Sequence, residues 1–489
     1  MMFKDKYKIG TSTTLSTNGE RSRTIGTSTT SFDRLSIRPE RPKGVEGLRT
    51  NGKQSRTIGI LSLGCPRNLV DSEGILGRLN FKGYSIVDMD KAEAAILNTC
   101  AFIEDAKTES VDAILDLIDL KRKGKLKKII VYGCLVQRYK DALIKELPEI
   151  DAFVGRVSFP AKLSTTQTGS RLLSKIDWRE NHSLGRFPLT PSHYAYLKIC
   201  EGCINNCSYC VIPRIKGRFN SLQMDSILKK VERFNQDKIS ELNIIGQDIT
   251  GYGVDLYKIP KLTELLKRIV KITKNIGWIR LLYLYPNRVT DELIELVRGE
   301  PKICKYIDLP IQHINDRILK LMQRHTKKKD ILRLVDKIRK RIPGVALRTS
   351  LIVGFPSEQD EEFEELLTFI KEIRFERLGA FVYSREEGTK AFDFKKQVPD
   401  KIKRERFNAI MSCQQKISQD INKKFLGRII DVLIDEKEGG VYLGRSQYDA
   451  PEVDGLVYVN SKNELKPGDL VKVKIADTLE YDLVGESLE

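Results

Sequence analysis

The stretch HYAYLKICEGCINNCSYC, residues 193–210, decides the fold of the central part of the chain. It begins as a short apolar strand and ends in a loop that carries Cys203, Cys207 and Cys210. Further strand-like runs follow at ELNIIGQD, WIRLLYLYP, YIDLPIQ, ALRTSLIVGF and LGAFVYS, with amphipathic helical segments between them. Six βα units in succession predict a full or partial (β/α) barrel, whose functional groups gather at the carboxyl ends of the strands. The three cysteines follow the first strand at that end.

The spacing of these cysteines, Cys-x3-Cys-x2-Cys, lets one loop wrap three corners of a cubane iron–sulfur cluster. The fourth iron is then left without a protein ligand and is open to a substrate or a second cofactor. A zinc knuckle is the alternative interpretation, although structural zinc sites normally use four ligands.

A second set of cysteines precedes this series. The apolar runs TIGILSLGC, AAILNTC and KIIVYGC each end at a cysteine, namely Cys65, Cys100 and Cys134. Nearly continuous apolar strands that alternate with helices predict a doubly wound parallel sheet, in which ligands bind beyond the carboxyl ends of the strands. We therefore expect the three thiols to converge on one crevice. Three buried core cysteines are the alternative.

Changes in composition divide the chain further. Residues 1–55 are polar, and NGERSRTIG at 18–26 returns as NGKQSRTIG at 51–59. We interpret this part as a disordered or non-native leader, with an organelle transit peptide as the alternative. The short β-like runs near the end predict a small antiparallel barrel. The predicted division is a leader at 1–55, an N-terminal domain at 56–165, a linker at 166–190, a barrel core at 191–423 and a β-barrel at 424–489.

Composition indicates the compartment and the kind of partner. The 489 residues contain no apolar run of about eighteen residues and no secretory signal, which predicts a cytoplasmic protein without a membrane partner. In that compartment the nine cysteines are better explained as ligands or thiols than as disulfides. The net charge of +18 indicates a polyanionic partner such as RNA or a ribosome surface. Residues 424–489 nevertheless carry −6, which leaves +24 on the rest.

The loop with Cys203, Cys207 and Cys210 resembles the signature of the radical S-adenosylmethionine superfamily. That resemblance implies a 4Fe–4S cluster whose open iron chelates S-adenosyl-L-methionine. Electron transfer from the reduced cluster then yields a 5′-deoxyadenosyl radical, while the protein binds, orients and excludes competing reactions.

The upstream blocks SLGCPRNLVDSE, LNTCAF and YGCLVQR resemble the methylthiotransferases within that superfamily. The similarity continues through IIGQDITGYG, LYLYPN, DLPIQHINDRILKLMQRHT, RTSLIVGFPSE and YSREEGTKA to a C-terminal TRAM barrel. It implies a second, auxiliary 4Fe–4S cluster held by Cys65, Cys100 and Cys134, and a partial TIM barrel as the core. The chain departs from the family pattern at IKGRFNSLQ and at Ser357, which replaces a usual glycine.

The family has branches that modify either tRNA adenosines or an aspartate of a small-subunit ribosomal protein. SLGCPRN and GRSQYDAPEVDG resemble the aspartate branch. A barrel with a net charge of −6, to which Asp449, Glu452 and Asp454 contribute, would repel tRNA and would suit a basic ribosomal protein. We therefore expect a basic ribosomal protein substrate, free or within the ribosome, together with an electron donor. We expect the enzyme to be a monomer.

The resemblance also implies a course for the reaction. One S-adenosylmethionine methylates a sulfur on the auxiliary cluster, and a second gives the radical that abstracts a hydrogen from the aspartate β-carbon. Gln247 and Arg348 fall in blocks that face the barrel mouth, so we expect them to contact the cofactor. We interpret two histidines, His313 and His325, as structural. Three further cysteines match no ligand position, namely Cys200, Cys304 and Cys413. No residue is assigned a catalytic role. The alternatives are a tRNA adenosine methylthiotransferase and a non-catalytic iron–sulfur or zinc protein that binds ribosomes.

Overall fold

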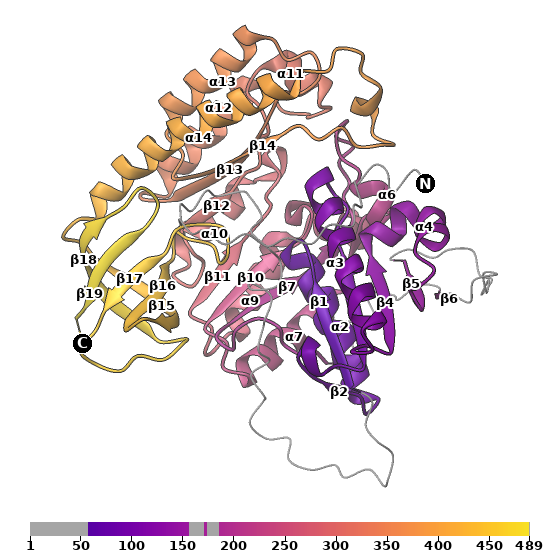
Figure 1. The fold of residues 1–489 in the computed structure, drawn as a ribbon. Helices are drawn as coiled ribbons and strands as arrows, with labels where there is room; N and C mark the ends of the chain where they lie inside the picture. The colour runs from indigo at the N-terminus through magenta and orange to yellow at the C-terminus, as the bar shows by residue number, and fades with distance from the viewer. Residues whose placement is uncertain (1–56, 156–170, 174–184, 489) are drawn as a thin grey trace. The chain divides into compact units, whose positions relative to one another are not determined.

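The computed structural model describes residues 57–155, 171–173 and 185–488 (Figure 1). The predicted leader at 1–55 lies outside the described residues, and the predicted domain limits stay a prediction. The described chain forms two units. One contains residues up to 189 together with 214–216, and the other contains 190–213 and 217 onward.

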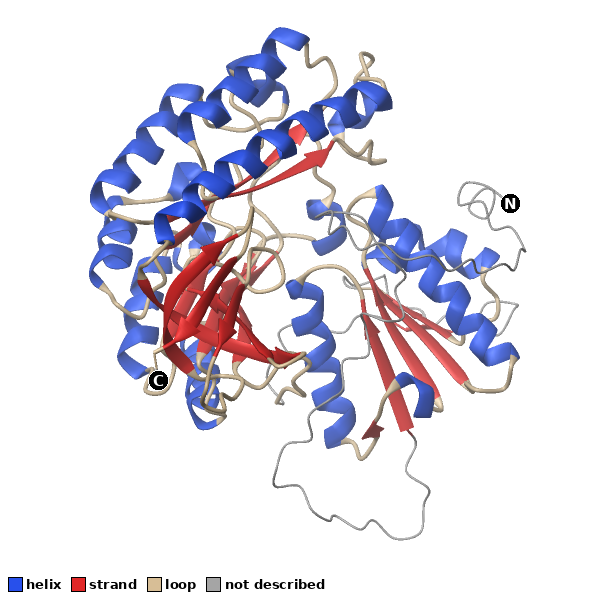
Figure 2. Ribbon diagram, turned by 60° about the vertical axis from the view of Figure 1, so that its left-hand side comes forward, coloured by secondary structure: helices blue, strands red, loops and turns tan. Residues whose placement is uncertain are grey.

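The first unit is built on a parallel sheet in the order β2-β1-β3-β4-β5-β6. Its strands are β1 (Thr57–Ser62), β2 (Ser85–Ile86), β3 (Ala94–Thr99), β4 (Lys128–Gly133), β5 (Ala152–Val154) and β6 (Arg171–Leu173). Its helices are α2 (Pro66–Phe81), the 3-10 turn η1 (Met89–Lys91), α3 (Glu104–Arg122) and α4 (Cys134–Glu146). α2 covers one face of the sheet, whereas α3 and α4 cover the other (Figure 2). The predicted doubly wound sheet is confirmed, and β6 lies within the range expected to be a linker.

The strand order positions the first set of cysteines. The chain leaves β1 towards β2 on one side and returns to β3 on the other, so the order reverses between β1 and β3. Such a switch point opens a crevice at the carboxyl ends of the two strands. Cys65 follows β1 and Cys100 follows β3, so these two thiols flank that crevice.

The second unit contains six parallel strands at the expected sequence positions. They are β7 (Tyr194–Lys198), β10 (Glu241–Ile245), β11 (Trp278–Leu281), β12 (Tyr306–Asp308), β13 (Ala346–Val353) and β14 (Arg377–Val382). Sheets β7-β10-β11 and β12-β13-β14 meet where Cys304 N donates to Ile279 O at 3.0 Å and Leu284 N donates to Asp308 O at 3.0 Å. The predicted partial TIM barrel is therefore confirmed.

Helices and turns connect these strands. The α-helices are α6 (Ile212–Lys216), α7 (Met224–Gln236), α8 (Val254–Tyr257), α9 (Leu262–Ile272), α10 (Asp291–Gly299), α11 (Asp316–Leu321), α12 (Lys328–Arg341), α13 (Asp360–Ile373) and α14 (Asp400–Asn422). The 3-10 turns are η2 (Ile249–Gly251), η3 (Pro286–Arg288), η4 (Lys390–Asp393) and η5 (Lys423–Phe425). The short strands β8 (Cys200–Glu201) and β9 (Asn220–Ser221) pair beside the cysteine loop. No helix in the described ranges is long and apolar enough to cross a membrane.

The C-terminal part is a closed barrel in the order β15-β16-β17-β19-β18. Its strands are β15 (Ile429–Glu438), β16 (Val441–Ser446), β17 (Val457–Asn460), β18 (Leu470–Thr478) and β19 (Leu483–Ser487). Alternate residues such as Val457 and Val459, or Val473 and Ile475, point inward and form its core. This confirms the predicted small all-β barrel, but the expectation of a wholly antiparallel one is wrong, because β17 and β19 pair in parallel.

Candidate functional site

Three strand ends of the first unit each supply a thiol. Cys65 caps the amino end of α2, Cys100 directly follows β3, and Cys134 is the first residue of α4. Gly64 has a φ of +88°, and a Cβ at this position would lie 2.7 Å from the Cβ of Cys100. The loop before Cys65 can therefore approach Cys100 only because residue 64 is a glycine.

The side chain of Asn68 contacts all three of these strand ends. Its Nδ2 donates to Leu63 O at 3.0 Å and to Thr99 O at 3.3 Å, while its Oδ1 lies 4.0 Å from the Cys134 sulfur. Oδ1 also accepts a hydrogen bond from Lys216 Nζ at 3.4 Å. Sequence reasoning missed this role, and the only available signal was a polar residue in the first helical turn after Cys65.

The three thiols differ in their electrostatic environment. Burial raises the pKa of Cys65, but the positive charges of Arg67 and Lys216 outweigh burial and bring that pKa down to about 7. Burial, followed by the charges of Cys134 and Cys65, raises the pKa of Cys100 to about 12. Because the charges of both other thiols raise the pKa of Cys100, added positive charge at this place would favour the Cys100 thiolate.

Added positive charge of this kind is what an iron–sulfur cluster supplies. Within the described part of the chain, no three His, Cys, Asp or Glu side chains are grouped closely enough to hold a single metal ion. A cubane cluster sets a different requirement, because each thiolate binds a different iron. The donor set of three soft sulfurs at the ends of the neighbouring strands β1, β3 and β4 therefore fits a cluster better than it fits one zinc ion.

The second triad lies on the loop after β8. Gly202 starts this loop with a φ of +77°, and a Cβ there would lie 2.8 Å from Arg218 O. Asn205 points its backbone N and its Nδ2 at the Cys203 sulfur, at 3.4 and 3.3 Å. Ser208 fixes the middle of the loop, because its N donates to Met322 O at 3.0 Å. Ser208 O also accepts a hydrogen bond from Ala391 N at 2.8 Å, so the loop that carries the sulfurs is held at Ser208 by two other segments.

Gln247, a predicted cofactor contact, lies just beyond β10 next to this loop. Its Nε2 donates to Glu201 Oε1 at 3.2 Å, and Glu201 forms a buried ion pair with Lys198. The Oε1 atom of Gln247 is buried and has no hydrogen-bond partner among the described residues. A buried amide oxygen without a hydrogen-bond donor costs free energy. This oxygen is therefore a candidate acceptor for a hydrogen bond from a ligand.

A chain of polar side-chain contacts lies beside Cys203, and sequence reasoning missed it. Asn205 Nδ2 donates to Asp248 Oδ2 at 2.9 Å, and Asp248 also pairs with Arg288. The guanidinium of Arg288 stacks over the ring of Tyr285, 4.5 Å from its centroid. Asp248 and Tyr285 stand in the quoted blocks IIGQDITGYG and LYLYPN, but nothing in the sequence indicates that both contact Arg288.

Arg348, the other predicted cofactor contact, has carboxylate partners within the protein. Its Nη1 lies 3.2 Å from Asp308 Oδ1, and its Nε lies 3.5 Å from Asp454 Oδ1. Asp454 comes from the loop between β16 and β17, which packs against the amino ends of the core strands. Tyr306, at the start of β12, donates to the same carboxylate at 2.7 Å. A cofactor role for Arg348 stays a prediction.

The same loop corrects the interpretation of the C-terminal carboxylates. The side chains of Asp449 and Asp454 are 3 % and 4 % exposed; Asp449 pairs with Arg377 at the start of β14. Glu452 accepts a hydrogen bond from Tyr194 at 3.1 Å. The expectation that these acids add to a charge that repels tRNA is wrong for Asp449 and Asp454, because each is buried and neutralises an arginine of the core. They attach the β-barrel to the base of the core instead.

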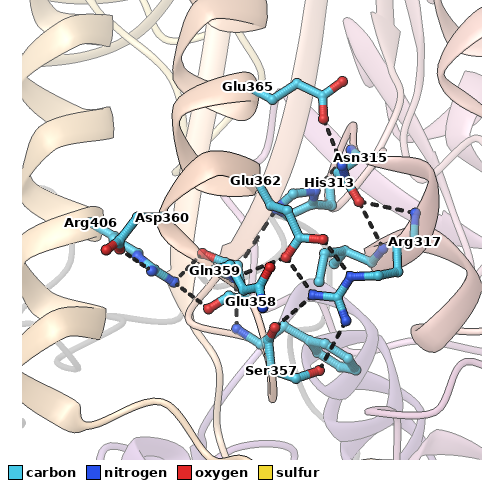
Figure 3. A network of polar contacts seen from close by, with 12 residues as sticks. His313, Asn315, Arg317, Ser357, Glu358, Gln359, Asp360, Glu362, Glu365 and Arg406 are labelled. Carbon is cyan, nitrogen blue, oxygen red and sulfur yellow. Dashed lines mark hydrogen bonds and ion pairs between the residues drawn. The ribbon is translucent and has the colours of Figure 1, made fainter.

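A polar network surrounds the loop after β13 (Figure 3). Burial lowers the pKa of His313 to about 4, so the ring is neutral. Its Nδ1 accepts from Asn315 N at 3.0 Å, and its Nε2 lies 3.8 Å from Glu358 Oε2. Arg406 donates to the other oxygen of Glu358 at 2.7 Å. These contacts support the structural interpretation of His313.

Ser357 stands where the family usually has glycine, and the structure shows how the backbone accommodates it. It has a φ of +65°, where a Cβ is strained. The residue is held there because its N donates to Lys396 O at 2.6 Å and its O accepts from Arg317 Nη2 at 2.7 Å.

We expect Ser357→Gly to raise the free energy of unfolding by about 0.5–1 kcal/mol, because relief of strain exceeds the entropy that glycine adds to the unfolded chain. Urea denaturation of the purified chain measures the change. Ser226→Gly, at an exposed position of α7, is the matched control and should lower stability by a similar amount. A loss of stability in Ser357→Gly would contradict the strain argument.

Three family profiles match the chain. Residues 57–155 match the "Uncharacterized protein family UPF0004", residues 197–370 match the radical SAM superfamily, and residues 426–488 match the TRAM domain.

Curated relatives extend the similarity to most of the chain. The ribosomal protein uS12 methylthiotransferase RimO of Clostridioides difficile is 46% identical over 87% of this chain and 98% of its own length. The protein of the same name from Caldanaerobacter subterraneus is 49% identical over 87% of this chain and 99% of its own length. Among solved structures, the radical S-adenosylmethionine methyltransferase TsrM of Kitasatospora setae has a TM-score of 0.50 at 14% identity, covering 80% of this chain and 81% of that one, which shows a shared fold.

Proposed function

Because the chain belongs to the RimO family of ribosomal protein uS12 methylthiotransferases, we propose that it inserts a methylthio group at the β-carbon of an aspartate in uS12. It is a radical S-adenosylmethionine enzyme with 4Fe–4S clusters and S-adenosyl-L-methionine as cofactors. The alternatives, a tRNA methylthiotransferase and a non-catalytic iron–sulfur protein, are not favoured by this membership.

One observation supports the assignment of the clusters above all others. The chain carries two separate triads of thiols: the first lies at the carboxyl ends of β1, β3 and β4, and the second lies on the single loop that follows β7 and β8. A single structural metal would need only one such triad. We assign Cys65, Cys100 and Cys134 to the auxiliary cluster and Cys203, Cys207 and Cys210 to the radical cluster.

Together, the bound clusters and S-adenosylmethionine supply the one-electron, methyl and sulfur chemistry of the reaction. The side chains of the protein hold and orient these groups. Of the two predicted cofactor contacts, Gln247 has a buried oxygen free for a ligand donor, whereas Arg348 already pairs with Asp308 and Asp454. We therefore propose Gln247 as the contact to S-adenosylmethionine.

The charge of the C-terminal barrel still supports a protein substrate after the correction above. Without Arg445 and the largely buried Asp435, Asp449 and Asp454, residues 424–489 keep seven Lys and Arg against eleven Asp and Glu, a net of −4. Such a surplus of negative charge attracts a basic ribosomal protein and repels phosphates. We propose that the enzyme acts in the cytoplasm as a monomer, on free or ribosome-bound uS12, and that it takes electrons from a separate donor protein.

Cys100→Ala tests whether the two triads hold separate clusters with separate roles in the reaction. The full chain is reconstituted anaerobically, analysed for iron and sulfide, and incubated with S-adenosylmethionine, dithionite and uS12. The variant should keep about four of about eight irons and should still release 5′-deoxyadenosine, but should give no methylthiolated aspartate. Cys413→Ala, which changes an unassigned thiol on α14, is the control and should behave like the wild type. Methylthiolation of uS12 by Cys100→Ala would contradict the proposal.

A further inference from the structure

Arg324 carries a buried positive charge beside the second triad. The residue follows α11 and is 8 % exposed. Its Nη2 donates to Pro310 O, its Nη1 lies 4.0 Å from the Cys207 sulfur, and its guanidinium stacks 4.3 Å from the ring centroid of Tyr285. Its Nε has no hydrogen-bond partner among the described residues.

No carboxylate in the described part of the chain lies within ion-pair distance of Arg324. Arg288 stacks on the same ring of Tyr285, but its charge is neutralised by Asp248. A buried charge without a counter-charge costs several kcal/mol, so buried arginines are normally paired. The group that Arg324 faces is instead the sulfur of Cys207.

The backbone holds Arg324 against the loop of the triad. Ser208 N donates to Met322 O at 3.0 Å, and Ser208 Oγ donates to Leu321 O at 2.7 Å. Gln323 then adopts a φ of +55°, which turns the chain immediately before Arg324. The residue next to Cys207 and the residues before Arg324 are thus bound to each other, so the guanidinium and the sulfur keep their relative position.

We infer that Arg324 is the counter-cation of the cluster held by Cys203, Cys207 and Cys210, and that its charge raises the reduction potential of that cluster. The inference rests on the cluster assignment proposed above. One-electron reduction adds a negative charge to a group that already carries three thiolates, so a fixed positive charge beside Cys207 stabilises the reduced form more than the oxidised form.

The test is a redox titration followed by electron paramagnetic resonance, with dithionite as the reductant. The full chain also carries Cys65→Ser, Cys100→Ser and Cys134→Ser, so that only the radical cluster gives a signal. Arg324→Met should reduce the ratio of reduced to oxidised cluster at least about tenfold at a fixed solution potential, which is about 59 mV for a one-electron couple. Arg324→Lys should keep most of the wild-type ratio. Arg333→Gln, which removes an equal charge from an exposed position of α12, is the matched control and should leave the ratio unchanged.

A wild-type ratio in Arg324→Met, or an equal shift in Arg333→Gln, would overturn the inference. If Arg324→Met fails to take up iron, Arg324→Gln replaces it, and the same shift is expected. If both neutral variants lose the cluster but Arg324→Lys keeps it, the result would also support the requirement for positive charge. If all three variants lose the cluster, the role of Arg324 is purely structural and the inference is overturned. Failure of the parent chain to bind about four irons would refute the cluster assignment itself.

Discussion

Replacing Cys207 with alanine is expected to abolish the release of 5′-deoxyadenosine and to lower the iron content of the reconstituted chain from about eight to about four. Two thiolates that remain on a loop do not hold a cubane cluster, and without that cluster no electron reaches S-adenosylmethionine. Cys207 lies in the middle of the loop, between Asn205 and Ser208, so its loss removes the central ligand and leaves the anchors of the loop in place.

Iron and sulfide analysis and chromatography of the reaction products measure these two effects. Cys200→Ala is the matched control, because Cys200 is buried close to Gly246 and lies outside the ligand loop. It should keep both the iron content and the release of 5′-deoxyadenosine. Release of 5′-deoxyadenosine by Cys207→Ala would refute the assignment of the radical cluster.

Replacing Arg445 with methionine is expected to lower the free energy of unfolding of the second unit by about 3 kcal/mol. Arg445 lies in β16 and is 2 % exposed. Its Nη1 lies 2.7 Å from Glu241 Oε2, at the start of β10, and its Nε lies 2.7 Å from Asp435 Oδ2 in β15. Methionine fills similar space but removes the positive charge that pairs with the Glu241 and Asp435 carboxylates at the junction between the core and the β-barrel.

Urea denaturation followed by tryptophan fluorescence measures this loss. The chain has two tryptophans, so in a Trp178→Phe background only the buried Trp278 of β11 reports, and it belongs to the second unit. Lys472→Met is the matched control, because Lys472 is 68 % exposed and its pair with Asp431 should contribute less than about 1 kcal/mol. Equal stability losses in the two variants would contradict the role of the buried network.

The strands and the two triads could be predicted because their signals are local. A run such as AAILNTC shows both the strand and the thiol at its end, and parallel sheets bring such ends together whatever the details of packing. The positions of Asp449 and Asp454 could not be predicted in this way. Asp449 lies 72 residues from its partner Arg377, and no sequence period links a loop of the β-barrel to the first residue of a core strand.

The contacts around the sulfurs escaped prediction for the same reason. Asn68 meets Thr99 and Cys134 only because three parallel strands end side by side. Arg324 meets Cys207 only because Ser208 docks on the end of α11. The strain at Ser357 had a visible sign, a serine where the family usually has glycine, but its cause was visible only in the backbone angle.

The activity that we propose for this chain is the methylthiolation of a uS12 aspartate. The most direct measurement incubates the reconstituted enzyme with S-adenosylmethionine, dithionite and equimolar uS12 and tRNA, and then analyses both substrates by mass spectrometry. We expect one uS12 aspartate to gain a methylthio group in place of hydrogen while the tRNA stays unmodified. A methylthio group on a tRNA adenosine together with unchanged uS12 would contradict this proposal.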